Sequence, residues 1–308
     1  MTFADSILTE LTAAGCGLRV SIGTGRRVPP RNLLDMELPG ADRDGDEDIK
    51  WAVSIRPGPS SQDPGPEGWS GSPTRRAFRG AGFNVVFEER TSVAHFDPGR
   101  IENAFTAAQF AVFGALRREG RADLHASAVV PRGSAAAIVL VGEAGHGKST
   151  MTLTALSEGW GFLSDDLIAL FVDKAGALTL SPLRRTLRVA ESAIPLLPPG
   201  ARAGTWTEGT PRKMVVDPEA CGLGPRHLRI RPGRLVFLEH GARKRILPLL
   251  SGEAFQRLIL HSPHIAFDPD ARAAISALKR LADEVPARSA ALPLDSLHDA
   301  ATLEDFLA

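Results

Sequence analysis

A glycine-rich segment between an apolar run and a helical pattern constrains this chain most. Residues 142–149 match G-x-x-x-x-G-K-[ST] in full and read Gly-Glu-Ala-Gly-His-Gly-Lys-Ser. The apolar run at 135–141 is typical of a buried strand, and residues 148–158 have a helical pattern that stops at Gly159. A strand, a glycine-rich turn and a helix in this order predict a phosphate-binding loop, here called the P-loop (142–149).

The residue types of the P-loop suit the phosphates of a nucleotide. Glycines let successive backbone N–H groups turn toward a phosphate, and the helix start adds the positive end of its dipole. A lysine supplies a cation to the β- and γ-phosphate oxygens, and a serine offers a hydroxyl ligand to Mg²⁺. We therefore expect ATP and Mg²⁺ as cofactors, bound by Gly142, Gly145, His146, Gly147, Lys148, Ser149 and Thr150.

Two adjacent carboxylates end the next predicted strand, at 161–164. Asp165 lies 17 residues after Lys148, and Asp166 follows it. A ten-residue helix in between would return the chain alongside the P-loop strand, which places both carboxylates near the phosphates. One carboxylate can hold Mg²⁺ while the other accepts the proton of an attacking hydroxyl. A helix cap or an ordinary surface pair is the alternative interpretation.

One histidine and one basic stretch complete the candidate site. His125 lies on the predicted strand 124–130, where a packed core histidine is the alternative to a catalytic one. Residues 184–245 hold 13 basic and five acidic side chains, a net charge of +8 in a chain whose total is zero. Such a stretch indicates an anion site or a solvated surface. Its candidates for phosphate binding are Arg184, Arg185, Arg212 and Lys213.

The pattern divides the chain into two predicted domains. Residues 1–120 form a β-rich N-terminal module with strand-like runs at 18–22, 49–55, 83–87 and 92–96, and a connecting helix from 101 that ends at Gly120. Proline, glycine and serine make up 13 of the 17 residues at 57–73, which predicts a disordered loop. The module is expected either to contribute to substrate recognition or assembly, or only to cover the core.

Residues 121–308 form the predicted P-loop domain. Further strands are expected at 177–180 and 234–238, and helices at 253–260, 269–284 and 302–307, with Asp268 as the N-cap of the second.

Three segments, at 124–126, 142–149 and 159–166, resemble in order and spacing the HPr serine kinase/phosphorylase-like family. This family includes the HPr-kinase-related proteins of peptide-modification gene clusters and the lasso-peptide kinases. The segments read Leu-His-Ala, Gly-Glu-Ala-Gly-His-Gly-Lys-Ser and Gly-Trp-Gly-Phe-Leu-Ser-Asp-Asp. Weaker similarity continues at 182–187, 212–214 and 235–238. The resemblance implies an α/β fold with a P-loop kinase core of the HPr kinase/phosphoenolpyruvate carboxykinase-like type, a mixed sheet and not a doubly wound parallel one.

The resemblance also implies roles for single residues. Lys148 and Ser149 would bind phosphate and Mg²⁺, and Asp165 would be the general base toward a serine hydroxyl. Asp166 and His125 would complete the phosphate and metal environment, with Asp166 as a metal ligand beside Ser149. The Glu-x-x-Gly-like signature of the bifunctional enzymes is not found after Asp166, where residues 181–186 read Ser-Pro-Leu-Arg-Arg-Thr.

These observations predict an ATP- and Mg²⁺-dependent kinase that acts on a serine hydroxyl of a peptide or protein, or of a small molecule. A nucleotide-binding regulatory module without transfer, and phosphorylase or phosphatase chemistry at the same site, are the alternatives. The zero net charge disfavours nucleic acid and an anionic membrane surface as partners. The longest apolar run is far short of the ~20 residues that span a bilayer, so a cytoplasmic protein is expected. Assembly into a homo-oligomer is left open.

Overall fold

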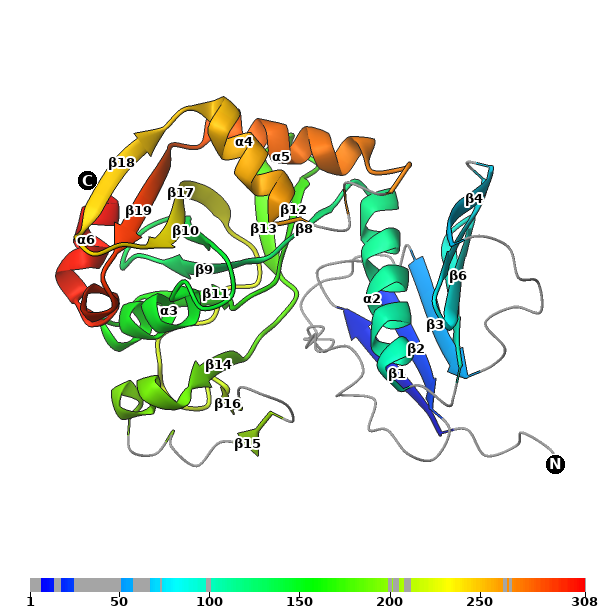
Figure 1. Cartoon of the computed structure of the whole chain (residues 1–308), viewed down its shortest axis with the longest axis horizontal. Helices are drawn as coiled ribbons and strands as arrows, with labels where there is room; N and C mark the ends of the chain where they lie inside the picture. Colours follow the sequence, from blue (N-terminus) through cyan, green and yellow to red (C-terminus); the bar gives the residue numbers. More distant parts are fainter. Residues whose placement is uncertain are drawn as a thin grey trace. The chain divides into compact units, whose positions relative to one another are not determined.

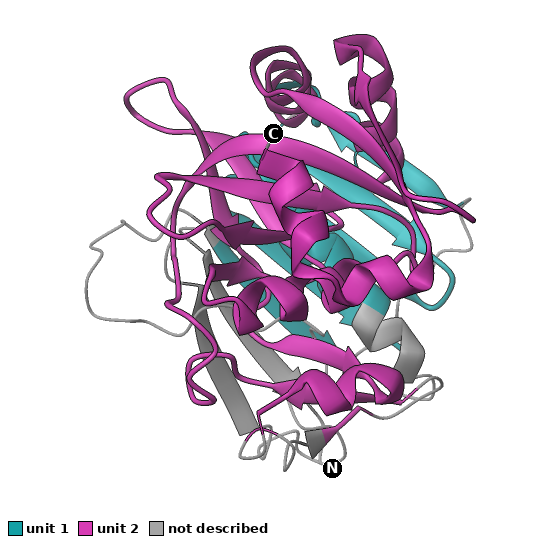
Figure 2. Ribbon diagram, turned by 90° about the vertical axis from the view of Figure 1, so that its left-hand side faces the viewer, with its two compact units in different colours: residues 1–122, 264–273 teal, residues 123–263, 274–308 magenta. Residues whose placement is uncertain are grey.

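The computed structural model describes residues 7–13, 18–24, 51–57, 67–72, 74–97, 101–198, 201, 205–207, 212–262, 265 and 268–307. These residues form a mixed α/β protein with both parallel and antiparallel strand pairs (Figure 1). Contacts divide the chain into two compact units (Figure 2). Unit 1 comprises residues 1–122 and 264–273, and unit 2 comprises residues 123–263 and 274–308.

Unit 1 is a seven-stranded sheet with one long helix against it (Figure 1). Its strand order is β1-β2-β3-β7-β6-β5-β4. Helix α2 (Ile101–Arg118) packs on β3, β6 and β7 through small and apolar side chains such as Ala108 and Val112. The strands are β1 (Ile7–Ala13), β2 (Leu18–Thr24), β3 (Trp51–Pro57), β4 (Gly68–Ser72), β5 (Arg75–Gly80), β6 (Phe83–Glu88) and β7 (Thr91–Phe96).

The strands expected at 18–22, 49–55, 83–87 and 92–96 correspond to β2, β3, β6 and β7, and the expected helix to α2. The prediction of a disordered loop over 57–73 is wrong for 68–72, because these residues form β4 and pair with β5. Trp69 gives this glycine- and serine-rich strand an aromatic anchor, since its ring lies 5.2 Å from the ring of Phe78. Residue 57 ends β3, and residues 58–66 and 73 lie outside the described residues.

The core of unit 2 is a six-stranded sheet in the order β11-β9-β10-β17-β19-β18. Strands β10, β17 and β19 are parallel, and β9 and β18 run antiparallel to their neighbours. Helix α3 (Lys148–Ser157) follows β10 and packs on the sheet through Met151 and Ala155. The strands are β9 (Ala126–Val130), β10 (Ala136–Val141), β11 (Gly161–Ser164), β17 (Arg231–His240), β18 (Arg245–Leu249) and β19 (Ala287–Leu292).

The strand order of this sheet differs from the expected one at β11. Strand β11 does not return alongside the P-loop strand β10 but pairs with β9. The short turn at 131–134 folds β9 back onto β10, so β9 occupies the side of β10 on which β11 was expected. Because β11 and β10 are both antiparallel to β9, they run in the same direction. The end of β11 therefore still lies at the P-loop edge of the sheet.

Two three-stranded sheets and several helices complete unit 2. Their orders are β13-β12-β8 and β14-β16-β15. The elements are β8 (Ala122–Leu124), β12 (Ile168–Val172), β13 (Leu178–Pro182), β14 (Leu187–Ala190), 3₁₀ helix η1 (Glu191–Leu196), β15 (Thr205–Trp206), β16 (Lys213–Val216), α4 (Ser251–Leu260), α5 (Arg272–Glu284), 3₁₀ helix η3 (Leu294–His298) and α6 (Ala300–Leu307).

Helix α5 begins at Arg272 and not at 269, so Asp268 is not its N-cap. Instead, the Asp268 carboxylate accepts a 2.7 Å hydrogen bond from Arg117 Nε, and both side chains are completely buried. A buried arginine needs such a partner. The other Asp268 oxygen accepts the Asp270 backbone N–H at 3.0 Å in the turn before α5. Among the described residues, no helix has the length and apolar character needed to span a bilayer.

Candidate active site

The P-loop joins β10 to α3 through backbone conformations that require glycine. Gly145 and Gly147 have φ angles of 90° and 89°, in the left-handed region that side chains disfavour. At Gly142 a Cβ atom would lie 2.8 Å from the Leu238 carbonyl oxygen, so only glycine allows this close approach to β17. A loop of this conformation can turn its N–H groups toward a bound anion.

Lys148 lies folded over the P-loop at the start of α3. Its Nζ donates hydrogen bonds to the carbonyl oxygens of Gly142 at 2.7 Å and Glu143 at 3.2 Å. The side chain is only 5% exposed, and burial lowers the pKa of Lys148 from its usual value. The ammonium group is therefore held at the loop before any ligand arrives.

Asp165 is the buried member of the carboxylate pair. Its Oδ1 accepts hydrogen bonds from Ser127 Oγ at 2.7 Å and Ser149 Oγ at 3.0 Å, and its Oδ2 accepts one from the Arg188 backbone N–H at 3.1 Å. The residue is fully buried. Burial, followed by the neighbouring charge of Asp166, raises the pKa of the Asp165 carboxyl. This carboxylate faces the P-loop serine and has no exposed surface.

Asp166 is the accessible member, with 31% of its side chain exposed. Its Oδ1 lies 2.8 Å from His125 Nε2 and 4.0 Å from Lys148 Nζ, and its Oδ2 lies 2.6 Å from Arg184 NH1. Burial alone would raise the pKa of Asp166, but the hydrogen bond to His125 and the positive charges around it hold the pKa well below its usual range. Asp166 is therefore an ionised carboxylate at neutral pH.

The backbone at Asp166 has a φ of 70°, which is rare for a residue other than glycine. Its N–H points to Ser127 Oγ at 3.3 Å. This turn directly after β11 lets two adjacent carboxylates reach the same site, although neighbouring side chains on a strand point to opposite faces. Uncommon backbone angles of this kind are concentrated at functional sites.

The structure brings His125, Lys148, Ser149, Asp165, Asp166 and Arg184 together. Lys213 on β16 lies close enough for its charge to lower the pKa of Lys148. Arg212 instead lies over the Trp206 ring, 5.3 Å from the ring centre. Arg185 is half-buried next to Arg184, and the Thr150 carbonyl accepts a hydrogen bond from Thr154 Oγ1 within α3. His146 Nδ1 donates to the Leu238 carbonyl at 3.0 Å, which ties the P-loop to β17.

Two residues of the site were not among the sequence candidates. Ser127 contacts both Asp165 and the backbone of Asp166, and Arg188 binds Asp165 through its N–H. The strand expected at 124–130 is interrupted at His125, which lies between β8 and β9 and on neither of them. Ser127 lies on β9 two positions after His125, and residues two apart on an extended chain share a face. That spacing is a usable signal for Ser127. The backbone contact of Arg188 leaves no trace in its residue type.

The donors at this site fit Mg²⁺. Among the described residues no group of three or more His, Cys, Asp or Glu side chains could hold a metal ion by itself. Mg²⁺ usually needs only one or two protein ligands, because nucleotide phosphates and waters supply the others. Ser149 Oγ lies 3.0 and 3.1 Å from the two Asp165 oxygens, and a hydroxyl beside a carboxylate is the usual pair for Mg²⁺ in P-loop proteins.

Comparisons with known proteins find a similarity in structure and none in sequence. No protein-family model matches the chain, and no curated protein sequence matches it. Among solved structures, the HPr(Ser) kinase/phosphatase from Coxiella burnetii is similar at 15% sequence identity and a TM-score of 0.32. That match covers 60% of this chain and 93% of the other. A similarity this low assigns no activity, so the assignment must come from the site itself.

We expect Ser127→Ala to lower the free energy of unfolding by about 2 kcal/mol, because it removes a donor from a buried carboxylate. Ser134→Ala, at an exposed turn where the hydroxyl bonds the backbone of Ala136, is the matched control and should cost about 0.5 kcal/mol. Urea unfolding of both variants measures the difference. Equal losses would show that the Ser127–Asp165 hydrogen bond contributes little.

Proposed function

We propose that this chain is an ATP- and Mg²⁺-dependent kinase that transfers the γ-phosphoryl group to a serine hydroxyl of a peptide or protein. The observation that carries the proposal is the arrangement at the end of β11. There an accessible carboxylate lies within 4.0 Å of the P-loop lysine and contacts a histidine and an arginine. A nucleotide-binding protein without transfer chemistry needs the lysine but not the exposed carboxylate beside it.

Each part of this arrangement has a function in phosphoryl transfer. Bound Mg²⁺ would neutralise charge on the phosphates; the Ser149 hydroxyl would hold it, and Asp165 would act on the metal through its hydrogen bonds to that hydroxyl. Lys148 and Arg184 supply fixed positive charge where negative charge develops during transfer. Asp166 is ionised and accessible, so it can accept the proton of the attacking hydroxyl. Its lowered pKa makes it a weak base, which suffices when the proton moves late in a loose transition state.

The proposed roles of the two aspartates differ from those implied by the sequence resemblance. Asp165 was the expected base, but it is fully buried and bound by two serine hydroxyls and one backbone N–H. An acceptor hydroxyl cannot reach such a carboxylate without displacing those groups. We therefore assign Asp165 to the Mg²⁺ site together with Ser149, and Asp166 to proton transfer. His125 fixes the orientation of the Asp166 carboxylate.

The direct test is incubation of the full chain with γ-labelled ATP, Mg²⁺ and candidate peptides encoded near its own gene. Label on a peptide serine supports the proposal. ATP binding without label on any acceptor would favour a nucleotide-binding regulatory module. Release of phosphate from a phosphoserine peptide would favour phosphatase activity.

Among the four basic candidates, Arg184 is the one expected to be catalytic. Its guanidinium is 6% exposed and lies 2.6 Å from Asp166 Oδ2. We expect Arg184→Lys to lower the transfer rate about 10- to 100-fold, because lysine keeps the charge but loses the fork geometry. Arg226→Lys is the matched control, since Arg226 lies in the same basic stretch and pairs with Asp217 and Glu219. Steady-state rates of both variants provide the comparison, and equal rates would exclude a special role for Arg184.

A further inference from the structure

The strand order of unit 2 fixes the direction in which a nucleotide can lie. In the order β11-β9-β10-β17-β19-β18, the P-loop follows β10, and the carboxylates follow β11 on one side of it. If the proposed function is correct, the γ-phosphate lies on the β11 side, near Asp166. The rest of the nucleotide must then extend to the other side, over the ends of β17 and β19.

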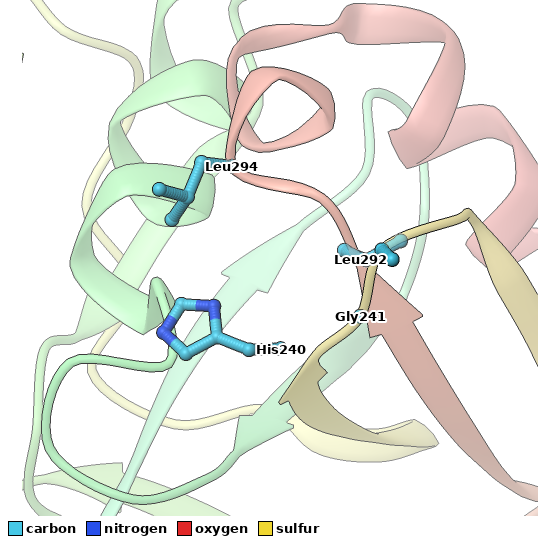
Figure 3. A pocket seen from close by; sticks show the side chains of 5 residues that line it. His240, Gly241, Leu292 and Leu294 are labelled. Carbon is cyan, nitrogen blue, oxygen red and sulfur yellow. The ribbon is translucent and has the colours of Figure 1, made fainter.

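An open pocket of about 360 Å³ lies at that place, a size within the range of small-molecule sites. It is lined by His240, Gly241, Ala242, Leu292 and Leu294 (Figure 3). His240 and Leu292 are paired neighbours at the ends of β17 and β19, and the Gly241 N–H donates to the Leu292 carbonyl at 3.0 Å. All five residues come from the last residues of these two strands and from the segments that follow them.

The pocket is directly connected to the P-loop. The His146 ring of the loop packs edge-on against the His240 ring, with centres 5.1 Å apart. A Cβ atom on Gly147 would lie 2.6 Å from Leu297 Cδ1, so η3 packs tightly against the loop. The Leu297 carbonyl also accepts a hydrogen bond from Thr154 Oγ1 of α3 at 2.9 Å. These contacts hold the segment that carries Leu294 in a fixed position next to the phosphate site.

Two exposed side chains at the pocket are well placed to bind a flat ring. Leu294 is 63% exposed, and His240 is exposed as well. Both line the same pocket, with the His240 ring below Leu294 in the view of Figure 3. An apolar side chain and an aromatic ring are the groups that pack on the faces of a nucleobase.

We propose that this pocket binds the nucleoside of the nucleotide, with the base between Leu294 and His240. This inference rests on the proposed nucleotide binding. It adds a binding site for the base, whereas the P-loop residues bind only the phosphates. Gly241 and Ala242 line the same pocket and would lie beside the base. The resulting site continues from Asp166 through the P-loop to η3.

The test compares two ligands that differ only by the nucleoside, Mg·ADP and Mg·pyrophosphate, by calorimetric titration of the full chain. The wild type should bind ADP at least about tenfold more tightly than pyrophosphate. His240→Ala and Leu294→Ala should each weaken ADP binding about five- to tenfold and leave pyrophosphate binding unchanged. Ala242→Trp, an exposed substitution that fills the pocket, should have the same effect. Leu250→Ala, at a leucine that is 75% exposed outside the pocket, is the control and should change neither.

Other outcomes overturn the inference. Equal binding of ADP and pyrophosphate by the wild type, unchanged ADP binding in the pocket variants, or equal loss of both ligands would each exclude this pocket as the nucleoside site. Equal binding of the two ligands, or unchanged ADP binding in the pocket variants, would still support phosphate binding by the P-loop. Failure of the wild type to bind either ligand would overturn the proposed function itself, and the pocket assignment with it.

Discussion

Replacing Lys148 with methionine is expected to lower kcat/KM for phosphoryl transfer about 10²- to 10³-fold, and to weaken ATP binding. The Nζ group is already held over the P-loop by the carbonyl oxygens of Gly142 and Glu143, so it can meet a phosphate without reorganisation. Loss of one preorganised donor to developing negative charge costs this much in other enzymes. Methionine keeps most of the side-chain volume, which limits damage to the start of α3.

Lys279→Met is the matched control, because Lys279 on α5 is exposed and pairs with Asp283 four residues later. Such surface pairs contribute little, so this variant should bind ATP like the wild type. Equilibrium titration with ATP and initial transfer rates are the measurements. Wild-type values for Lys148→Met would overturn the assignment of nucleotide phosphates to the P-loop.

The local pattern of the sequence predicted the elements that carry the site, because these elements have strong local signals. The run before Gly142 is apolar throughout and forms β10, and the glycines of the P-loop occupy positions that only glycine tolerates. The order of strand, loop and helix was therefore predictable. The proximity of Asp165 and Asp166 to Lys148 was expected from a return of β11 alongside β10, but it arises because β9 pairs with both strands and sets them in the same direction.

Elements with weak local signals could not be predicted in the same way. Strand β19 reads Ala-Arg-Ser-Ala-Ala-Leu, which lacks branched residues at Cβ, and it exists because β17 and β18 pair with it on both sides. Strand β18 contains Pro248 and lies at the sheet edge, where a proline is tolerated. Such strands form because of their neighbours in the sheet. The residues of the strand itself do not show which neighbours it will have.

The proposed division of roles between the two aspartates was equally inaccessible to the sequence. Both residues are the same type at adjacent positions, and only the turn at Asp166 makes one buried and the other exposed. Ser127 stabilises this difference by contacting both residues. The sequence could predict a pair of carboxylates at the site, but burial determines which one an acceptor can reach.

Asparagine substitutions at the two aspartates should therefore have different effects. Asp166→Asn is expected to reduce the transfer rate about 10²- to 10⁴-fold, the usual contribution of a general base, while ATP affinity changes little. The amide of the substituted side chain still offers a carbonyl oxygen to Arg184 or His125, so the surrounding side chains keep a partner. Asp165→Asn is expected to weaken ATP binding in the presence of Mg²⁺ and to leave binding without Mg²⁺ almost unchanged, because its carboxylate faces Ser149.

Single-turnover rates and ATP titrations with and without Mg²⁺ separate these effects for each variant. Asp283→Asn is the control, since Asp283 is a surface carboxylate that pairs with Lys279. If Asp165→Asn keeps Mg²⁺-dependent binding and loses transfer while Asp166→Asn transfers normally, the buried carboxylate is the base. That result would require Ser127 and Ser149 to release Asp165 when an acceptor binds, because the donors that now surround it would otherwise block the proton it must accept.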